Sequence, residues 1–115
     1  MKSELREMRK GKILIVEDEV IIALDLKKTL KDLGYSLVGT VTSGEEAVKA
    51  AGKMHPDLIL MDIKLQGHIN GLEAGKKIQD KFNIPIIYIT AYSDKETFGL
   101  IKKTNSFFFI LPNHL

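Results

Sequence analysis

The chain has 115 residues, of which 44% are hydrophobic and 28% are charged, and it contains no cysteine. This composition is typical of one globular domain and not of a disordered chain. No apolar run approaches the roughly 20 residues that cross a bilayer, and the opening MKSELREMRK has no apolar centre and is therefore not a secretion signal. The lack of cysteine excludes disulfides and thiolate metal sites. We expect a cytoplasmic protein that does not contact a membrane.

The net charge of +2 is concentrated at the N-terminus. The first twelve residues carry a balance of +3, from Lys2, Arg6, Arg9, Lys10 and Lys12 against Glu4 and Glu7, so the rest of the chain carries −1. We interpret residues 1–11 as a basic leader and residues 12–115 as the folded domain. Because this domain is nearly neutral, we expect it to bind no nucleic acid.

Five short apolar runs punctuate the chain, and each is continuous rather than alternating. They are Ile13–Val16, Leu37–Val41, Leu58–Met61, Ile86–Ile89 and Phe107–Leu111. Continuous apolar strands are typical of a parallel sheet that is covered on both faces.

The segments between these runs have helical signals. Residues 19–33 place Ile22, Leu26, Leu30 and Leu33 at helical spacing, and Gly34 supplies a stop. The next three helices are predicted by capping pairs, Ser43 with Glu46, Asn70 with Glu73 and Ser93 with Glu96. Alternating strands and helices indicate an α/β fold, a doubly wound parallel sheet. Only PNHL follows the fifth run, so we expect the fifth helix to be missing from this chain.

Acidic residues follow two of the predicted strands. Glu17 and Asp18 end the first strand and Asp62 ends the third, while Thr90 ends the fourth. Ligands bind beyond the carboxyl ends of parallel strands, so these side chains are expected to meet. Clustered carboxylates repel unless a cation is present, and an oxygen-only set favours Mg²⁺, with Mn²⁺ as a second option. A carboxylate beside such an ion is suited to nucleophilic attack on phosphorus.

The stretches ILIVEDE, DLILMDIKLQGHINGLEA and IPIIYITAYSD resemble the motifs of response-regulator receiver domains of two-component systems, over roughly residues 12 to 112. The resemblance implies a flavodoxin-like fold with five strands in the order 2-1-3-4-5. It implies that Asp62 accepts a phosphoryl group from a sensor histidine kinase or a phosphotransfer protein. The chain would then be a signalling phosphoprotein rather than an enzyme, although it would assist its own phosphotransfer and dephosphorylation.

Further roles follow from the same resemblance. Asp18 would bind Mg²⁺ directly, Glu17 would act through a water molecule, and the backbone carbonyl of Lys64 would add a third protein oxygen. Thr90 would supply the switch hydroxyl, and Ala91 would leave room for the phosphate. Glu19 is interpreted as an acid of the helix's first turn and not as a ligand.

The C-terminus departs from the family's pattern. Receivers carry a lysine at the end of the fifth strand before a proline, whereas FFFILPNHL places Leu111 or Pro112 there. The same ambiguity makes the switch aromatic Phe108 or Phe109. We therefore keep a second hypothesis, a pseudo-receiver that binds partners without a phosphate switch. A small phosphohydrolase is disfavoured because Lys64 stands where such enzymes need a second acid. A homodimer is a further hypothesis for this chain.

Overall fold

The computed structural model describes residues 11–91 and 107–111, with the backbone alone at residues 90, 91 and 107–111. Five strands form one parallel sheet, namely β1 (Lys12–Val16), β2 (Ser36–Val41), β3 (Leu58–Asp62), β4 (Ile86–Ala91) and β5 (Phe107–Leu111). Their order is β2-β1-β3-β4-β5, which confirms the predicted topology.

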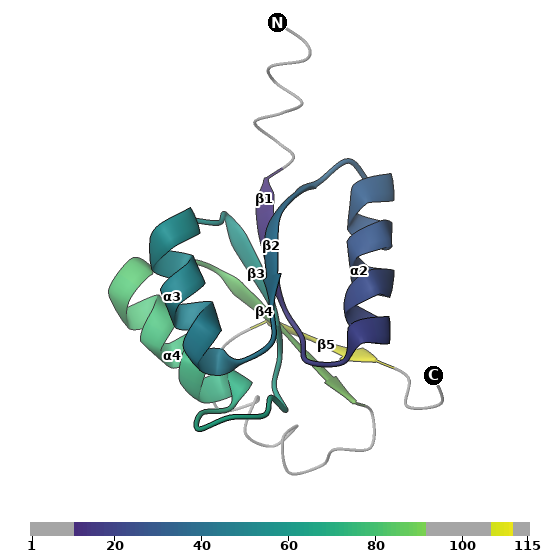
Figure 1. Cartoon of the computed structure of the whole chain (residues 1–115). Coiled ribbons are helices and arrows are strands. Elements are labelled where there is room, and N and C mark those ends of the chain that lie inside the picture. The colour runs from purple at the N-terminus through teal and green to yellow at the C-terminus, as the bar shows by residue number, and fades with distance from the viewer. Residues whose placement is uncertain (1–10, 92–106, 112–115) are drawn as a thin grey trace, which may run out of the picture.

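Helices cover both faces of this sheet, as predicted for a doubly wound fold. Helix α2 (Val20–Asp32) lies on one face, and α3 (Gly44–Met54) and α4 (Gly71–Phe82) lie together on the other (Figure 1). None of the helices in the described part of the chain is long and apolar enough to cross a membrane. The helix predicted from Ser93, residues 1–10 of the basic leader and the residues after β5 lie outside the described residues.

Two of the predicted helix caps are present. The Ser43 side chain accepts a hydrogen bond from the Glu46 N–H at 3.1 Å. At α4, Asn70 accepts from the Glu73 N–H at 2.9 Å while Glu73 accepts from the Asn70 N–H at 3.0 Å, a complete capping box. At α3 the Glu46 carboxylate reaches back to the backbone N–H of Thr42, at 3.3 Å.

Helix α2 ends at the predicted glycine. Gly34 has a φ of 93°, a left-handed conformation that glycine adopts without strain. Its N–H donates to the Lys31 carbonyl at 2.9 Å, and the Tyr35 N–H donates to the Leu30 carbonyl at 3.0 Å. These two bonds form a Schellman motif, which satisfies carbonyls at the helix end.

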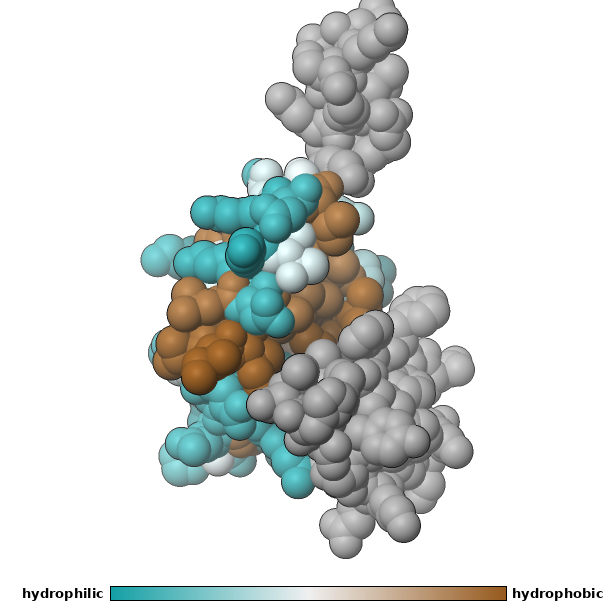
Figure 2. Space-filling view, turned by 90° about the vertical axis from the view of Figure 1, so that its right-hand side faces the viewer, coloured by the Kyte–Doolittle hydropathy of each residue, from teal (hydrophilic) through white to brown (hydrophobic). Residues whose placement is uncertain are grey.

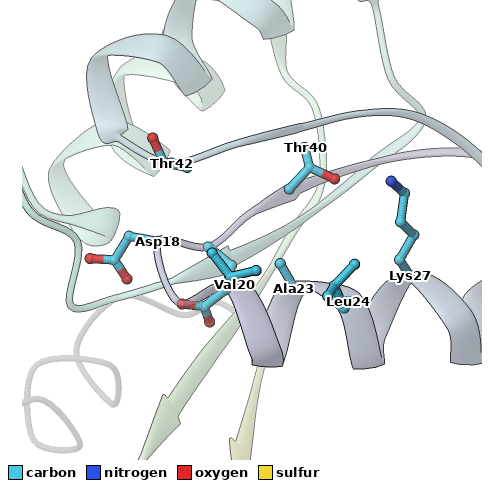
Figure 3. A pocket seen from close by; sticks show the side chains of 8 residues that line it. Asp18, Val20, Ala23, Leu24, Lys27, Thr40 and Thr42 are labelled. Atoms are coloured by element: carbon cyan, nitrogen blue, oxygen red, sulfur yellow. The ribbon is translucent and has the colours of Figure 1, made fainter.

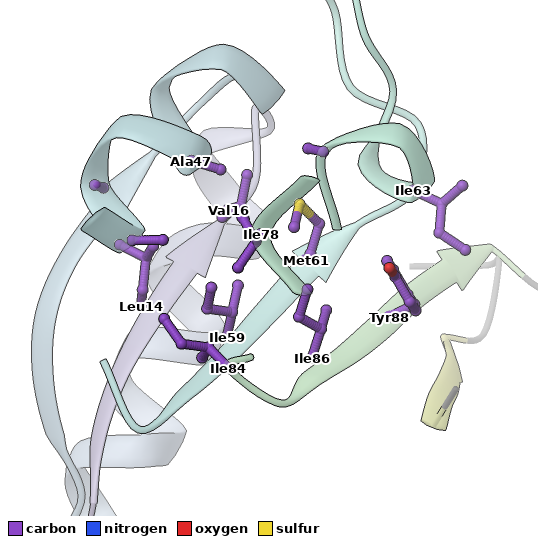
Figure 4. Packing of buried hydrophobic residues seen from close by; sticks show 13 residues of the cluster. Leu14, Val16, Ala47, Ile59, Met61, Ile63, Ile78, Ile84, Ile86 and Tyr88 are labelled. Atoms are coloured by element: carbon purple, nitrogen blue, oxygen red, sulfur yellow. The ribbon is translucent and has the colours of Figure 1, made fainter. Parts of the chain in front are cut away.

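The main hydrophobic core lies between the sheet and the α3–α4 pair (Figure 4). Large side chains come from the strands and mostly small ones from the helices; among the buried members are Leu14, Val16, Ile59, Met61, Ile86, Tyr88, Ala47, Ala50, Ala51, Ala74 and Ile78. Alanine at the helix surface lets both helices approach the sheet closely, so strand side chains fill the space between the layers.

The face of the sheet that α2 covers is less completely buried than the continuous apolar strands led us to expect. In β3, Ile59 and Met61 are buried on the α3–α4 side, whereas Leu58 and Leu60 are half-buried. Helix α2 contains no fully buried residue, and Leu33 at its C-cap has 55% of its surface exposed. Apolar side chains therefore reach the surface on this side of the molecule (Figure 2).

Candidate metal centre

Three carboxylates converge at the carboxyl ends of β1 and β3. Val16 pairs with Met61 across these strands, so the residues that follow, Glu17 and Asp62, are neighbours. Carboxylate oxygens of Glu17, Asp18 and Asp62 all lie within 4.8 Å of one another. The structure therefore brings together the three acids that the sequence placed at one edge of the sheet.

Glu17 is the most deeply placed acid, with only 2% of its surface exposed. Its Oε2 accepts a hydrogen bond from the Glu19 N–H at 3.0 Å, and its own N–H donates to the Val41 carbonyl at 2.9 Å, which ties it to β2. Burial raises the pKa of Glu17 to about 8, although the Glu19 N–H opposes the shift, and the charge of Asp62 adds to it.

Asp62 is half-buried and belongs to the last position of β3. Its Oδ1 accepts a hydrogen bond from the Lys64 N–H at 3.1 Å. Burial raises the pKa of Asp62 to about 6; the hydrogen bonds with Glu17 and Lys64 lower it, and the charges of Asp18 and Glu19 raise it. Two desolvated acids this close disfavour the state in which both are ionised when no cation neutralises them.

This donor set fits a hard divalent cation. All the ligands that it offers are oxygens, with no histidine in the described group, and such a set suits Mg²⁺ or Mn²⁺. A divalent charge would also relieve the repulsion that keeps a proton on the acid pair. The Lys64 N–H donates a hydrogen bond to Asp62, so the backbone of Lys64 lies beside the acids. This position is the one that a backbone carbonyl ligand from Lys64 would need.

The remaining predicted site residues are placed by their backbones. Asp62 pairs with Ile89, so Thr90 is the next residue along β4 at the same edge of the sheet. On β5, Phe108 pairs with Tyr88 and Phe109 with Ile89, while Leu111 pairs with Ala91 at the strand's end. Leu111 thus occupies the end of β5, where the family's pattern has its lysine.

An open hollow of about 190 Å³ adjoins the acids and was not predicted from the sequence (Figure 3). It is lined by the link between β1 and α2, by the first turns of α2 and by the end of β2 with the residue that follows it, namely Glu17, Asp18, Val20, Ala23, Leu24, Lys27, Thr40 and Thr42. Val20 and Leu24 are 71% and 58% exposed, and Ile21 beside them is 83% exposed. The signal in the sequence was the pair of large aliphatic residues, Val20 and Ile21, that follows the acids directly.

Comparison with known proteins agrees with this geometry. The family model described as "Response regulator receiver domain" matches residues 13–111. The transcriptional regulatory protein PdtaR of Mycobacterium tuberculosis is 39% identical over 85 residues, which cover 74% of this chain and 41% of that protein. The phyllosphere-induced regulator PhyR of Methylorubrum extorquens is 42% identical over 84 residues, covering 72% and 32%.

A solved structure shows the same fold. The signal receiver domain of a modulated diguanylate cyclase from Desulfovibrio desulfuricans is 40% identical, with a TM-score of 0.80 over 89% of this chain and 80% of that one. The present chain thus spans less than half of each curated relative but most of this single domain. With the family model covering nearly the whole chain, the protein belongs to the response regulator receiver domain family.

Proposed function

We propose that the chain accepts a phosphoryl group on Asp62 in a Mg²⁺-dependent reaction and thereby relays a signal. The observation that carries the proposal is the convergence of Glu17, Asp18 and Asp62, with carboxylate oxygens within 4.8 Å of one another at the carboxyl edge of the sheet. No separate substrate is turned over, because the chain itself is the acceptor. Without cysteine, it is suited to the reducing cytoplasm.

The reaction exchanges one bond to phosphorus for another. A carboxylate oxygen of Asp62 forms the new P–O bond, and the P–N bond of a donor phosphohistidine breaks with its electron pair staying on the imidazole nitrogen. Asp62 must be ionised to attack, and it is held in place by the Lys64 N–H on Oδ1. When bound, a divalent cation supplies neutralising charge for the phosphoryl oxygens.

The other residues of the proposed site prepare Asp62 for this step. Asp18 would bind the cation directly, and Glu17, which is 2% exposed, would hold it through a water molecule. The Thr90 hydroxyl turns toward the phosphoryl group, as the family resemblance implies, and Phe108 or Phe109 follows it in the switch. Slow attack of water on phosphorus later releases phosphate and restores the Asp62 carboxylate.

A sensor histidine kinase or a phosphotransfer protein is the proposed donor. Exposed apolar side chains lie beside the acids on α2, where Val20, Ile21 and Leu24 expose 71%, 83% and 58% of their surface. Apolar side chains gathered beside a reactive group favour contact with another protein. We name the exposed surface of Val20, Ile21 and Leu24 the α2 apolar patch.

One observation favours a second function, a binding module without a phosphate switch. The end of β5 holds Leu111 in the place of the family's lysine, and that lysine contacts the phosphoryl oxygens in the family's pattern. Phosphate acceptance and the conformational relay can therefore be separated in this chain.

Intact-mass measurement tests phosphate acceptance directly. Wild type is incubated with a small-molecule phosphodonor with and without Mg²⁺, and Asp62→Asn is the control. We expect a mass gain of one phosphoryl group that needs both Mg²⁺ and Asp62. No gain in folded protein that binds Mg²⁺ would instead support the binding module.

A further inference from the structure

The loop that follows Asp62 is closed at both ends by backbone hydrogen bonds. The Ile63 carbonyl accepts from the Leu65 N–H at 3.2 Å and from the Gly71 N–H at 2.8 Å. Residues 64–70 therefore leave and rejoin the fold at nearly the same point. This stretch, which we call the acceptor loop, begins with Lys64, whose N–H bonds to Asp62.

The middle of the acceptor loop rests on the first turn of α3. A Cβ added to Gly44 would meet the Ile69 Cγ1 at 2.8 Å, so the loop packs directly on the helix there. The next residue, Glu45, accepts a hydrogen bond at its Oε2 from the His68 N–H at 3.0 Å. Glu45 is thus joined to a residue far along the chain, across the space between α3 and the loop.

The other oxygen of the same carboxylate lies close to Gly67 in the loop. Gly67 has a φ of 114°, and a Cβ there would lie 3.1 Å from Glu45 Oε1. That oxygen is shielded from solvent and has no hydrogen-bond partner among the described residues. The hydrogen bond by which Glu45 holds the loop is therefore the one that its other oxygen, Oε2, accepts from the His68 N–H.

The charge of Glu45 suits this role. The His68 N–H and its own backbone N–H hold the pKa of Glu45 below its usual range, and the charges of His68 and Lys77 act in the same direction. Its place in the first turn of α3 also favours a negative side chain. The carboxylate is therefore ionised at neutral pH, and an ionised acceptor makes the stronger hydrogen bond.

We propose that Glu45 is a positioning residue for the metal centre, because its bond to the His68 N–H holds the acceptor loop, and with it Lys64, against Asp62. The inference rests on the proposed function, in which the Lys64 carbonyl binds the cation. Glu45 itself touches neither the acids nor the cation. It acts through the loop, as an outer-shell partner of the site does.

Three variants separate this role from a general loss of stability. Glu45→Ala removes the acceptor, and Glu45→Gln keeps a side-chain oxygen that can accept from His68. Asp80→Ala is the matched control, since it removes an exposed carboxylate of α4 that forms a surface ion pair with Lys76 at 4.0 Å. Mg²⁺ affinity is measured by calorimetry, and amide hydrogen exchange at His68 and Lys64 by NMR, below the melting temperature of each variant.

In Glu45→Ala we expect faster exchange at both amides and Mg²⁺ binding weakened by roughly tenfold, the lower end of the loss for outer-shell changes. Glu45→Gln should recover most of the affinity, and Asp80→Ala should match wild type. The proposal is overturned if Glu45→Ala matches Asp80→Ala, if His68 is released while Lys64 and the Mg²⁺ affinity are unchanged, or if Glu45→Gln is as weak as Glu45→Ala.

These readouts stand apart from phosphorylation. Wild type that binds Mg²⁺ but gains no phosphoryl group would contradict the proposed function, and the Mg²⁺ affinities would still decide the role of Glu45. If wild type bound no Mg²⁺, amide exchange at Lys64 would decide the role of Glu45. Faster exchange at Lys64 in Glu45→Ala, but not in Asp80→Ala, would show that Glu45 holds Lys64 against Asp62 through the loop.

Discussion

Glu17 and Asp62 show how the fold tunes single residues. Each is an ordinary carboxylic acid in the unfolded chain, yet both have raised pKa values in the folded protein, mainly because burial removes water from them. The folded protein without a cation therefore binds protons more tightly than the unfolded chain does. This difference links the metal centre to stability.

The metal-free protein should lose stability as pH rises. Because the folded-state pKa values of about 8 and about 6 lie above the unfolded values of 4.5 and 3.8, the stabilising contribution is complete below about pH 4 and lost by pH 8. We expect the urea midpoint of metal-free protein to fall between pH 6 and pH 8. Over the same range Mg²⁺ binding should tighten by up to about tenfold per pH unit, since the cation displaces a proton.

Glu17→Gln is the control for this pH dependence. Glutamine cannot ionise, so the urea midpoint of the variant should change much less between pH 6 and pH 8, while its Mg²⁺ binding weakens. A wild-type midpoint that rises over this interval in the absence of metal would contradict the assignment.

At this scale the acids could be predicted and their protonation could not. EDE after one apolar run and Asp62 after another are visible in the sequence, and parallel strands bring such ends together. The burial of Glu17 depends on its hydrogen bond to Val41 and on other parts of the chain that cover it in the fold. No local sequence pattern contains these long-range contacts. The hydrogen bond from His68 to Glu45 was missed for the same reason.

At the scale of elements, helix α4 lies against the site because two glycines allow it. A Cβ on Gly71 would overlap the carbonyl oxygen of Asp62, and one on Gly75 would overlap the hydroxyl of Tyr88. Tyr88 is itself buried, and burial raises the pKa of its hydroxyl to about 12. Helix α4 therefore contacts β3 at the backbone of Asp62 and β4 at the side chain of Tyr88.

Gly75→Ala should destabilise the protein by about 1–3 kcal/mol, the usual cost of overpacking, despite the better helix propensity of alanine. Adding Tyr88→Phe should recover part of this loss, because it removes the hydroxyl nearest to the new methyl group. Urea unfolding of the single variants, of the double variant and of Gln79→Ala, an exposed change in the same helix, measures the effect. Equal stability of Gly75→Ala and wild type would show that α4 can shift freely.

The strands and helices were largely predictable from the sequence, but how completely the helices bury each face of the sheet was not. The strand runs and the caps at Ser43 and Asn70 are local signals, and the structure contains them. Leu33 fitted the helical spacing equally well, yet it caps α2 and is exposed. The hydrophobicity of a strand does not indicate which face of the sheet a neighbouring helix covers. The partial burial of the sheet face beneath α2 could therefore not be predicted from the sequence.

For the whole molecule, the α2 apolar patch is the surface next to the acids that a donor protein would meet. The donor in this test is a phosphorylated histidine phosphotransfer protein that phosphorylates wild type. Ile21→Ser should slow phosphotransfer from this donor by about tenfold, because losing an exposed apolar contact costs about 1.4 kcal/mol of binding free energy. Phosphorylation by a small-molecule donor should stay unchanged, because Ile21 is 83% exposed and not among the three acids.

The comparison of the two donors separates docking from chemistry. Asp25→Ala is the matched control, an exposed change on the same helix outside the patch. If Ile21→Ser slowed both donors equally, the patch would be part of the acceptor site and not a docking surface.

The irregular pairing of β2 has a consequence for the molecule in solution. Ile13 pairs with Leu37 and Leu14 with Gly39, so Val38 is an extra residue that bulges from the strand. Strand β2 is an outer strand of the sheet, and its sequence SLVGTV has neither a charge nor a proline to discourage another chain from pairing with it. The bulge interrupts the regular spacing of its outward N–H and C=O groups, and we expect it to disfavour aggregation through this edge.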